Sequence, residues 1–241
     1  MNYALLDLYS DYLLSSYSAT TATGLSRLLH ENLSHDQISR MLNSEQLEPK
    51  DWWRMIKPQV RVIQREDGVI TIDDSIVEKE YTDENEIICW HYDHAKGCTV
   101  KGINFITALY TAGDVSLPVT FRLVAKTEQY TDEHGQRKRR SPVTKNDHFR
   151  AMVQQCVRNQ IPFQYVLSDL WFAAAENMCF VKLDLAKEFI MALKANRKVA
   201  RSLEEKQQGR YQRLEQLDAP EDTPILIYLE QVPFALHLLR Q

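Results

Sequence analysis

The 241-residue sequence has few glycines and prolines, few cysteines and no long apolar run. Its 7 glycines and 8 prolines exclude collagen-like and low-complexity chains. The four cysteines form no CxxC pair and no dense disulfide framework, so we expect a reducing compartment, the cytoplasm. No run of about 18 apolar residues occurs, which predicts no membrane-spanning helix and no membrane partner. The N-terminus has an early acid and no basic segment, unlike a secretory signal.

The composition is otherwise that of a soluble globular protein, with 44% hydrophobic and 26% charged residues and a net charge of −4. This net charge does not indicate a nucleic-acid-binding protein, but two segments are basic. Residues 137–150 carry six basic groups against one acid, a local sum of +5, and residues 194–213 carry seven against two, again +5. Such segments can contact phosphates, and a solvated loop and helix face explain them equally well. The residues we expect to bind DNA are Arg137, Lys138, Arg139, Arg140, Arg197, Lys198 and Arg201.

The first 62 residues predict a small helical domain. Apolar residues recur at helical spacing over 3–14, and Ser34 followed by Gln37 is typical of a capping box. A further helix around 52–56 is expected to end before Pro58. Residues 24–43 fit a DNA-binding helix-turn-helix, although any compact helical bundle gives the same pattern.

The rest of the chain predicts alternating strands and helices. Apolar runs and turn residues indicate strands, the first ending in acids and the second and third forming a hairpin, over 69–72, 102–110, 115–124, 163–167, 189–193, 225–229 and 234–239. Thr144, with Asp147 three residues later, is expected to cap a helix with a buried apolar face, and 173–181 is expected to form another. Residues 126–143 read as a polar loop.

This order of elements resembles the ribonuclease H-like fold, an α/β mixed sheet with flanking helices. The resemblance implies a core over 66–200, preceded by the helical domain and followed by a partial β-rich insertion over 201–241.

Two acids at the predicted ends of strands are the most informative feature of the sequence. One lies in Ile72-Asp73-Asp74-Ser75 and the other is Asp169, after Val166-Leu167-Ser168. Carboxylates held rigidly on adjacent strands suit Mg²⁺ or Mn²⁺, and two such ions can support phosphodiester cleavage. Acids at strand ends are, however, also common turn residues.

Several motifs resemble the DDE transposases of bacterial insertion sequences, with a likeness that spans the whole chain. They are Asp73-Asp-Ser…Glu78-Lys79, Trp90-His-Tyr-Asp-His94, Lys96-Gly97, Val100-Lys-Gly-Ile-Asn104, Val166-Leu-Ser-Asp-Leu-Trp-Phe172 and Glu176-Asn177. The resemblance implies a Mg²⁺- or Mn²⁺-dependent enzyme that cuts and joins double-stranded DNA at transposon ends, as a possible homodimer. Its first two catalytic, metal-binding acids map to Asp73 and Asp169, with Asp74 as the alternative for the first.

The third carboxylate of that family, a Glu on a helix after the insertion, has no clear counterpart. Glu204, Glu205 and Glu230 are the alternatives within the chain. We therefore expect a C-terminally truncated, inactive copy with an unfinished insertion whose strands are unpaired. A non-catalytic DNA-binding protein derived from a transposase is the alternative function.

Two other groups of residues allow a functional and a structural interpretation. Cys89, His91, His94 and Cys98 can all bind zinc, but their spacing crowds four ligands onto one short segment. Trp171 and Phe172, two and three residues after the second acid, fit core residues better than platforms for stacking bases.

Overall fold

The structure is a computed structural model that describes residues 3–17, 20–43 and 48–240. The chain divides into two compact units, Met1–Asp51 and Trp52–Gln241. Within the described ranges, no helix combines the length and the apolar character needed to cross a membrane.

The first unit contains three short helices, α1 (Tyr3–Ser15), α2 (Ala22–Leu28) and α3 (His35–Asn43). Tyr12, Leu25 and Ile38 form its small buried core, one residue from each helix. The predicted capping box is present, because the Gln37 backbone N–H donates to Ser34 Oγ and the Ser34 N–H donates to Gln37 Oε1. The prediction of a helical N-terminal region is thus confirmed at the level of its elements.

Helix α4 (Pro49–Ile63) contains Pro58 and continues past it, so the predicted helix end is wrong. The face of α4 that includes Trp53 and Val60 packs on the core of the second unit. The Trp52 indole N–H also donates to the Pro118 carbonyl at 2.6 Å. This packing outweighs the hydrogen bond that proline cannot donate. The division between the units therefore falls after Asp51, and not after residue 62 as the sequence suggested.

The second unit is built on a six-stranded mixed sheet. Its strands are β1 (Val69–Glu78), β2 (Ile88–Asp93), β3 (Cys98–Ala112), β4 (Val115–Leu123), β7 (Tyr165–Ser168) and β8 (Glu188–Met191). Strand β1 is central, antiparallel to β3 and parallel to β7, and β8 pairs in parallel with β7. Strands β2 and β4 both pair with β3. This order confirms the ribonuclease H-like mixed sheet, although the sequence reading missed β2.

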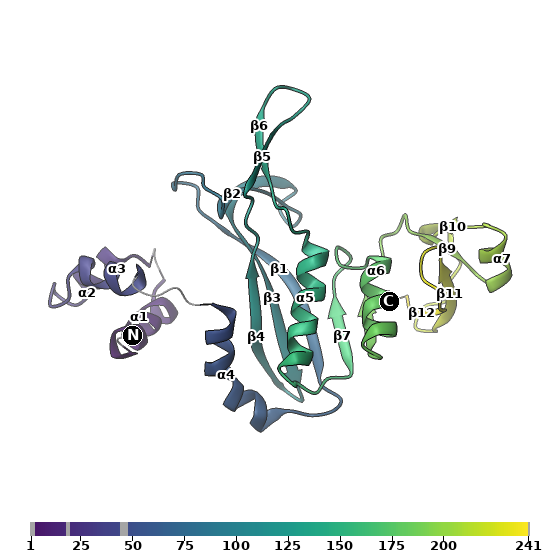
Figure 1. Cartoon of the computed structure of the whole chain (residues 1–241), viewed down its shortest axis with the longest axis horizontal. Helices are drawn as coiled ribbons and strands as arrows, with labels where there is room; N and C mark the ends of the chain where they lie inside the picture. The colour runs from purple at the N-terminus through teal and green to yellow at the C-terminus, as the bar shows by residue number, and fades with distance from the viewer. Residues whose placement is uncertain (1–2, 18–19, 44–47, 241) are drawn as a thin grey trace. The chain divides into compact units, whose positions relative to one another are not determined.

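One face of the sheet carries the main core. Alternate residues of β1 and β3, such as Ile70, Ile72 and Ile106, are buried there against α5 (Lys145–Arg158) and part of α4. Figure 1 shows α5 running along the strands. Thr144 and Asp147 form the predicted capping box at the start of α5.

The segment between β4 and α5 is a hairpin, and not the predicted loop. Strands β5 (Glu128–Thr131) and β6 (Arg137–Arg140) pair in antiparallel register, and the hairpin projects from the sheet in Figure 1. All but one of its strand residues are exposed, so the segment has no apolar alternation from which to predict strands.

After β7 the chain forms α6 (Ala175–Cys179), a π-helical turn (Phe180–Asp184) and β8. A second, four-stranded sheet follows, made of β9 (Lys198–Ala200), β10 (Gln212–Arg213), β11 (Ile225–Leu229) and β12 (Leu236–Leu238), with α7 (Leu203–Gln207) between β9 and β10. Val199, Ile227 and Leu229 are buried in its own core, together with Met178 of α6. The expectation of unpaired insertion strands is therefore wrong, because these strands pair with one another.

Candidate functional site

Asp73 lies in the middle of β1, and not at the strand end that the sequence suggested. Side chains alternate along a strand, so Asp73 points away from the core face occupied by Ile72. Ile72 is paired in parallel with Ser168, the last residue of β7. The next position on each strand is an aspartate, Asp73 on β1 and Asp169 after β7. The register therefore brings the two acids close together where β7 ends.

The turn after β7 orients Asp169. Its Oδ1 accepts a hydrogen bond from the Trp171 backbone N–H at 3.0 Å. The next residue, Phe172, is fully buried and stacks on Phe149 of α5. The buried Asn177 side chain donates to the Phe172 carbonyl and accepts from Arg150. Phe172 is thus a core residue, as predicted, and the turn that carries Asp169 is anchored to two helices.

Asp73 and Asp169 line one surface pocket, which Asp74, Asp93, His94 and Trp171 also line. Burial raises the pKa of Asp169, and the negative charges of Asp73 and Asp74 raise it further, against the opposing hydrogen bond from Trp171. The pocket therefore concentrates negative charge where one carboxylate is partly removed from water. Such an arrangement favours a bound cation, which would relieve the repulsion.

Asp74, which also lines the acidic pocket, is engaged in a polar cluster with residues of β3 and α5. Its Oδ2 accepts hydrogen bonds from Lys145 Nζ at 2.6 Å and from Asn104 Nδ2 at 2.8 Å. Lys145 is the first residue of α5, and Asn104 on β3 is fully buried. Asp74 thus links β1, β3 and α5. Its existing partners favour a structural role over the alternative role as first metal ligand.

The donor set at the acidic pocket fits a hard divalent cation. Mg²⁺ is commonly held by one or two carboxylates while water and substrate phosphates fill its other positions. Asp73 and Asp169 provide two such carboxylates. Across 3–17, 20–43 and 48–240, no three Asp, Glu, His or Cys side chains are grouped so as to hold a metal.

The glutamates weighed as a third carboxylate lie elsewhere. Glu205 Oε2 accepts from the Arg201 backbone N–H, and Ser202 caps the same helix, so Glu205 belongs to the N-terminus of α7. Glu230 lines a different pocket. Neither Glu204, Glu205 nor Glu230 lines the pocket of Asp73 and Asp169.

The four residues considered for zinc are not brought together. Cys89 Sγ lies 3.3 Å from His91 Nε2 on the inner face of β2, while Cys98 is exposed. The His94 ring instead stacks on Trp171 at 3.8 Å between centroids. Burial, with the positive charges of Lys126 and Lys145, lowers the pKa of His91 to about 4. His91 is therefore neutral near pH 7, and its ring and the Cys89 thiol form a buried structural pair.

The two basic segments differ in how their charges are compensated. On β6, three residues form ion pairs, Lys138 with Asp132, Arg139 with Glu84 and Arg140 with Glu128. Arg197 and Lys198 line a pocket next to the acidic one, and Arg201 is not among its lining residues.

Sequence reasoning missed two features of the site: the partners of Asp74, and the position of Trp171 between two pockets. Lys145 directly follows the predicted cap Thr144, but no local pattern shows that it reaches across to β1. The expectation that Trp171 is a core residue is wrong, because its side chain is 40% exposed and lines both pockets. Its place two residues after the second acid was the available signal.

Comparison with known proteins gives one family and one structural likeness. The sequence model of the family described as "DDE superfamily endonuclease" matches residues 3–226. No curated protein matches the chain. Among solved structures, the Drosophila P element transposase strand transfer complex is similar with a TM-score of 0.40 and 11% sequence identity, over 81% of this chain and 45% of that chain. The chain thus spans less than half the length of that transposase.

Proposed function

The chain belongs to the DDE superfamily endonucleases, and we propose that it acts on DNA as a transposase of the bacterial insertion-sequence kind. The observation that carries the proposal is the register of β1 and β7, which places Asp73 beside Asp169 in one pocket. These two carboxylates, on adjacent strands of this fold, correspond to the first two of the three metal-binding acids of a DDE endonuclease.

Asp73 and Asp169 would hold the metal, Mg²⁺ or Mn²⁺, since endonucleases of this superfamily use divalent ions. When bound, such ions activate water and stabilise the leaving oxygen of a phosphodiester. The protein's own contribution is to fix the two carboxylates, through the pairing of β1 with β7 and the anchored turn after Asp169. The proposed substrate is double-stranded DNA at transposon ends, with the chain acting as a homodimer. The four free cysteines support a reducing cytoplasm as its location.

Arg137, Lys138, Arg139, Arg140, Arg197, Lys198 and Arg201 remain the proposed DNA-binding residues. Of the three β6 ion pairs, Arg140–Glu128 joins two well-exposed side chains, 68% and 47% exposed, where such a pair contributes about 0–1 kcal/mol and can exchange for phosphate contacts. Asp132, the partner of Lys138, and Arg139 are only 10% and 22% exposed.

A non-catalytic DNA-binding protein is the second candidate. It is favoured by the acids of the pocket: Asp73 and Asp169 line it, while Asp74 is already paired with Lys145. In the part of the chain that the structure describes, no third metal-ligating side chain is grouped with these two.

Metal binding tests the proposal most directly, because it requires only the two acids. Calorimetric titration with Mn²⁺ should show binding to the wild type that Asp73→Asn and Asp169→Asn each lose. Plasmid nicking with Mg²⁺ or Mn²⁺ then tests the chemistry. Binding that survives both substitutions would refute the assignment of these acids. Metal and DNA binding without nicking would support the second candidate.

A further inference from the structure

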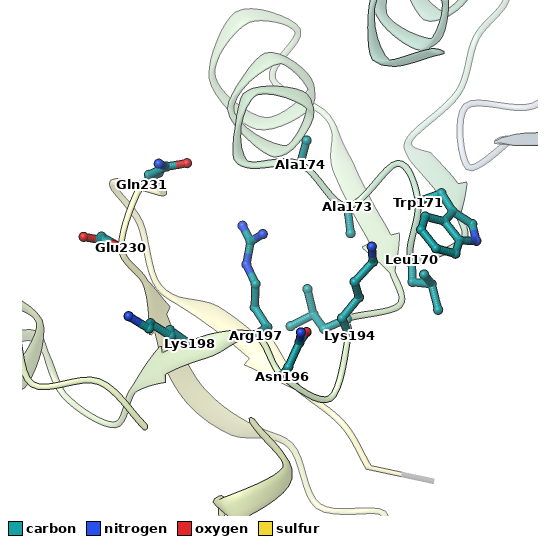
Figure 2. Close-up of a pocket in the computed structure, with 11 residues that line it drawn as sticks. Leu170, Trp171, Ala173, Ala174, Lys194, Asn196, Arg197, Lys198, Glu230 and Gln231 are labelled. Atoms are coloured by element: carbon teal, nitrogen blue, oxygen red, sulfur yellow. The ribbon is translucent and has the colours of Figure 1, made fainter. Parts of the chain in front are cut away.

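Trp171 separates two pockets of opposite charge. Trp171 lines the acidic pocket, where its ring stacks on the His94 ring with 3.8 Å between the centroids. The other is a pocket lined by the segment that joins β8 to β9 and by the turn after β11 (Figure 2). There, Lys194 Nζ lies 3.9 Å from the Trp171 ring centroid, within the range of a cation–π interaction. Lys194 is thereby held against the ring that also lines the pocket of Asp169.

This second pocket is lined by three cations, Lys194, Arg197 and Lys198, and by one acid, Glu230. Figure 2 shows the side chains of Lys194 and Arg197 extending into the pocket from the β8–β9 segment. Asn196 and Gln231 add amide groups to its lining, and Ala173 and Ala174 leave room on the opposite wall. The pocket therefore offers an excess of positive charge together with neutral hydrogen-bond donors.

Among the described residues, Lys194, Arg197 and Lys198 form no ion pair within 4.0 Å, not even with Glu230 of the same pocket. The basic residues of β6 differ, since Lys138, Arg139 and Arg140 each pair with a nearby acid. An uncompensated Arg beside a Lys is the arrangement that binds phosphate well. The guanidinium can donate two parallel hydrogen bonds, and the ammonium adds a point charge.

We propose that this pocket binds a backbone phosphate of the DNA strand whose neighbouring phosphodiester lies at Asp73 and Asp169. Arg197 and Lys194 contact the phosphate, and Trp171 is a positioning residue that holds Lys194 in place. The inference rests on the proposed function, because it takes DNA as the ligand of the adjacent acidic pocket. It adds a subsite that sets the register of the strand relative to the two acids.

The test is DNA binding in EDTA, measured by fluorescence anisotropy with a labelled 20-base-pair duplex over a range of KCl concentrations. The variant Lys194→Gln/Arg197→Gln should bind about tenfold more weakly. Its plot of log affinity against log salt should be less steep by about 0.9, the value for one lost phosphate contact. Arg65→Gln/Lys182→Gln is the matched control. It removes the same two residue types from ion pairs with Asp67 and Glu188, outside both pockets.

The positioning role of Trp171 has its own readout. Trp171→Phe keeps a ring under Lys194 and should keep the wild-type salt slope, whereas Trp171→Leu should move the slope towards that of the double variant. Equal losses in Trp171→Phe and Trp171→Leu would overturn this role.

The binding assay needs neither the metal nor the two acids, so its outcome is independent of the nicking assay. Loss of binding in the pocket variant without any nicking by the wild type would uphold the phosphate subsite and count against the endonuclease activity. The subsite is overturned if the pocket variant matches the control in affinity and slope, or if the wild type does not bind the duplex.

Discussion

Asp73 and Asp74 are adjacent in the sequence, and their substitutions should have opposite consequences. Asp74→Ala removes the carboxylate that accepts from Asn104 and Lys145. Asn104 is fully buried, and its Oδ1 already has no hydrogen-bond partner among the described residues. The substitution would therefore leave both ends of a buried amide unpaired.

The magnitude follows from these contacts. Leaving a buried amide donor unsatisfied costs about 1–3 kcal/mol. Lys145 is 38% exposed, so the loss of its ion pair adds at most about 1 kcal/mol. The free energy of unfolding should fall by about 1–4 kcal/mol, which lowers the Tm by about 2–16 °C for a chain of this size.

Thermal unfolding followed by circular dichroism measures this effect, with Asp73→Ala as the control. The Asp73 side chain is exposed, and its one hydrogen bond recorded in the structure is with the neighbouring Asp74 N–H. Its removal should change stability by no more than about 0.5 kcal/mol while abolishing Mn²⁺ binding. Asp74→Asn keeps an acceptor for Asn104 and should recover most of the lost stability and retain Mn²⁺ binding. Equal Tm values for the two alanine variants would refute the reasoning.

Two further predictions concern titratable groups. Because the pKa of Asp169 is raised in the fold, its ionisation costs stability as the pH rises above its unfolded value of 3.8. In EDTA at pH 7, Asp169→Asn should therefore unfold at a higher temperature than the wild type, and an unchanged or lower Tm would contradict this. The pKa of His91 is lowered to about 4, so stability is complete above 6.5 and is lost as the pH falls towards 4, because the unfolded chain takes up the proton first. Urea midpoints between pH 7 and 4 should fall less steeply for His91→Gln than for the exposed control His134→Gln, and parallel pH profiles would show that another group is responsible.

Local signals in the sequence determined many of the elements. The capping boxes at Ser34 and Thr144 formed as predicted, because a capping residue and its partner are only three positions apart. The hairpin of β3 and β4 followed from its apolar strands and its glycine turn, where Gly113 has a φ of 59°. The order of the elements was enough to predict a ribonuclease H-like sheet, whereas Asp73, Asp74 and Asp169 were singled out by their places beside apolar runs and by the resemblance to DDE transposases.

Errors occurred where a distant partner decides the structure. Helix α4 continues past Pro58 because its apolar face packs on a core formed by residues far along the chain. The strands β5 and β6 are polar and pair through their backbones, which leaves no hydrophobic pattern to detect.

The arrangement of the acids was decided by tertiary structure alone. Neighbouring residues on a strand face opposite sides of a sheet, so the choice between Asp73 and Asp74 depends on which side faces the core and on the register with β7. The same holds for the second pocket, where Lys194 meets Trp171 across 23 positions of sequence (194 − 171 = 23). The sequence by itself supplied the chemical groups, and only the pairing of strands determined which of them lie together, because those contacts join residues that no local interaction connects.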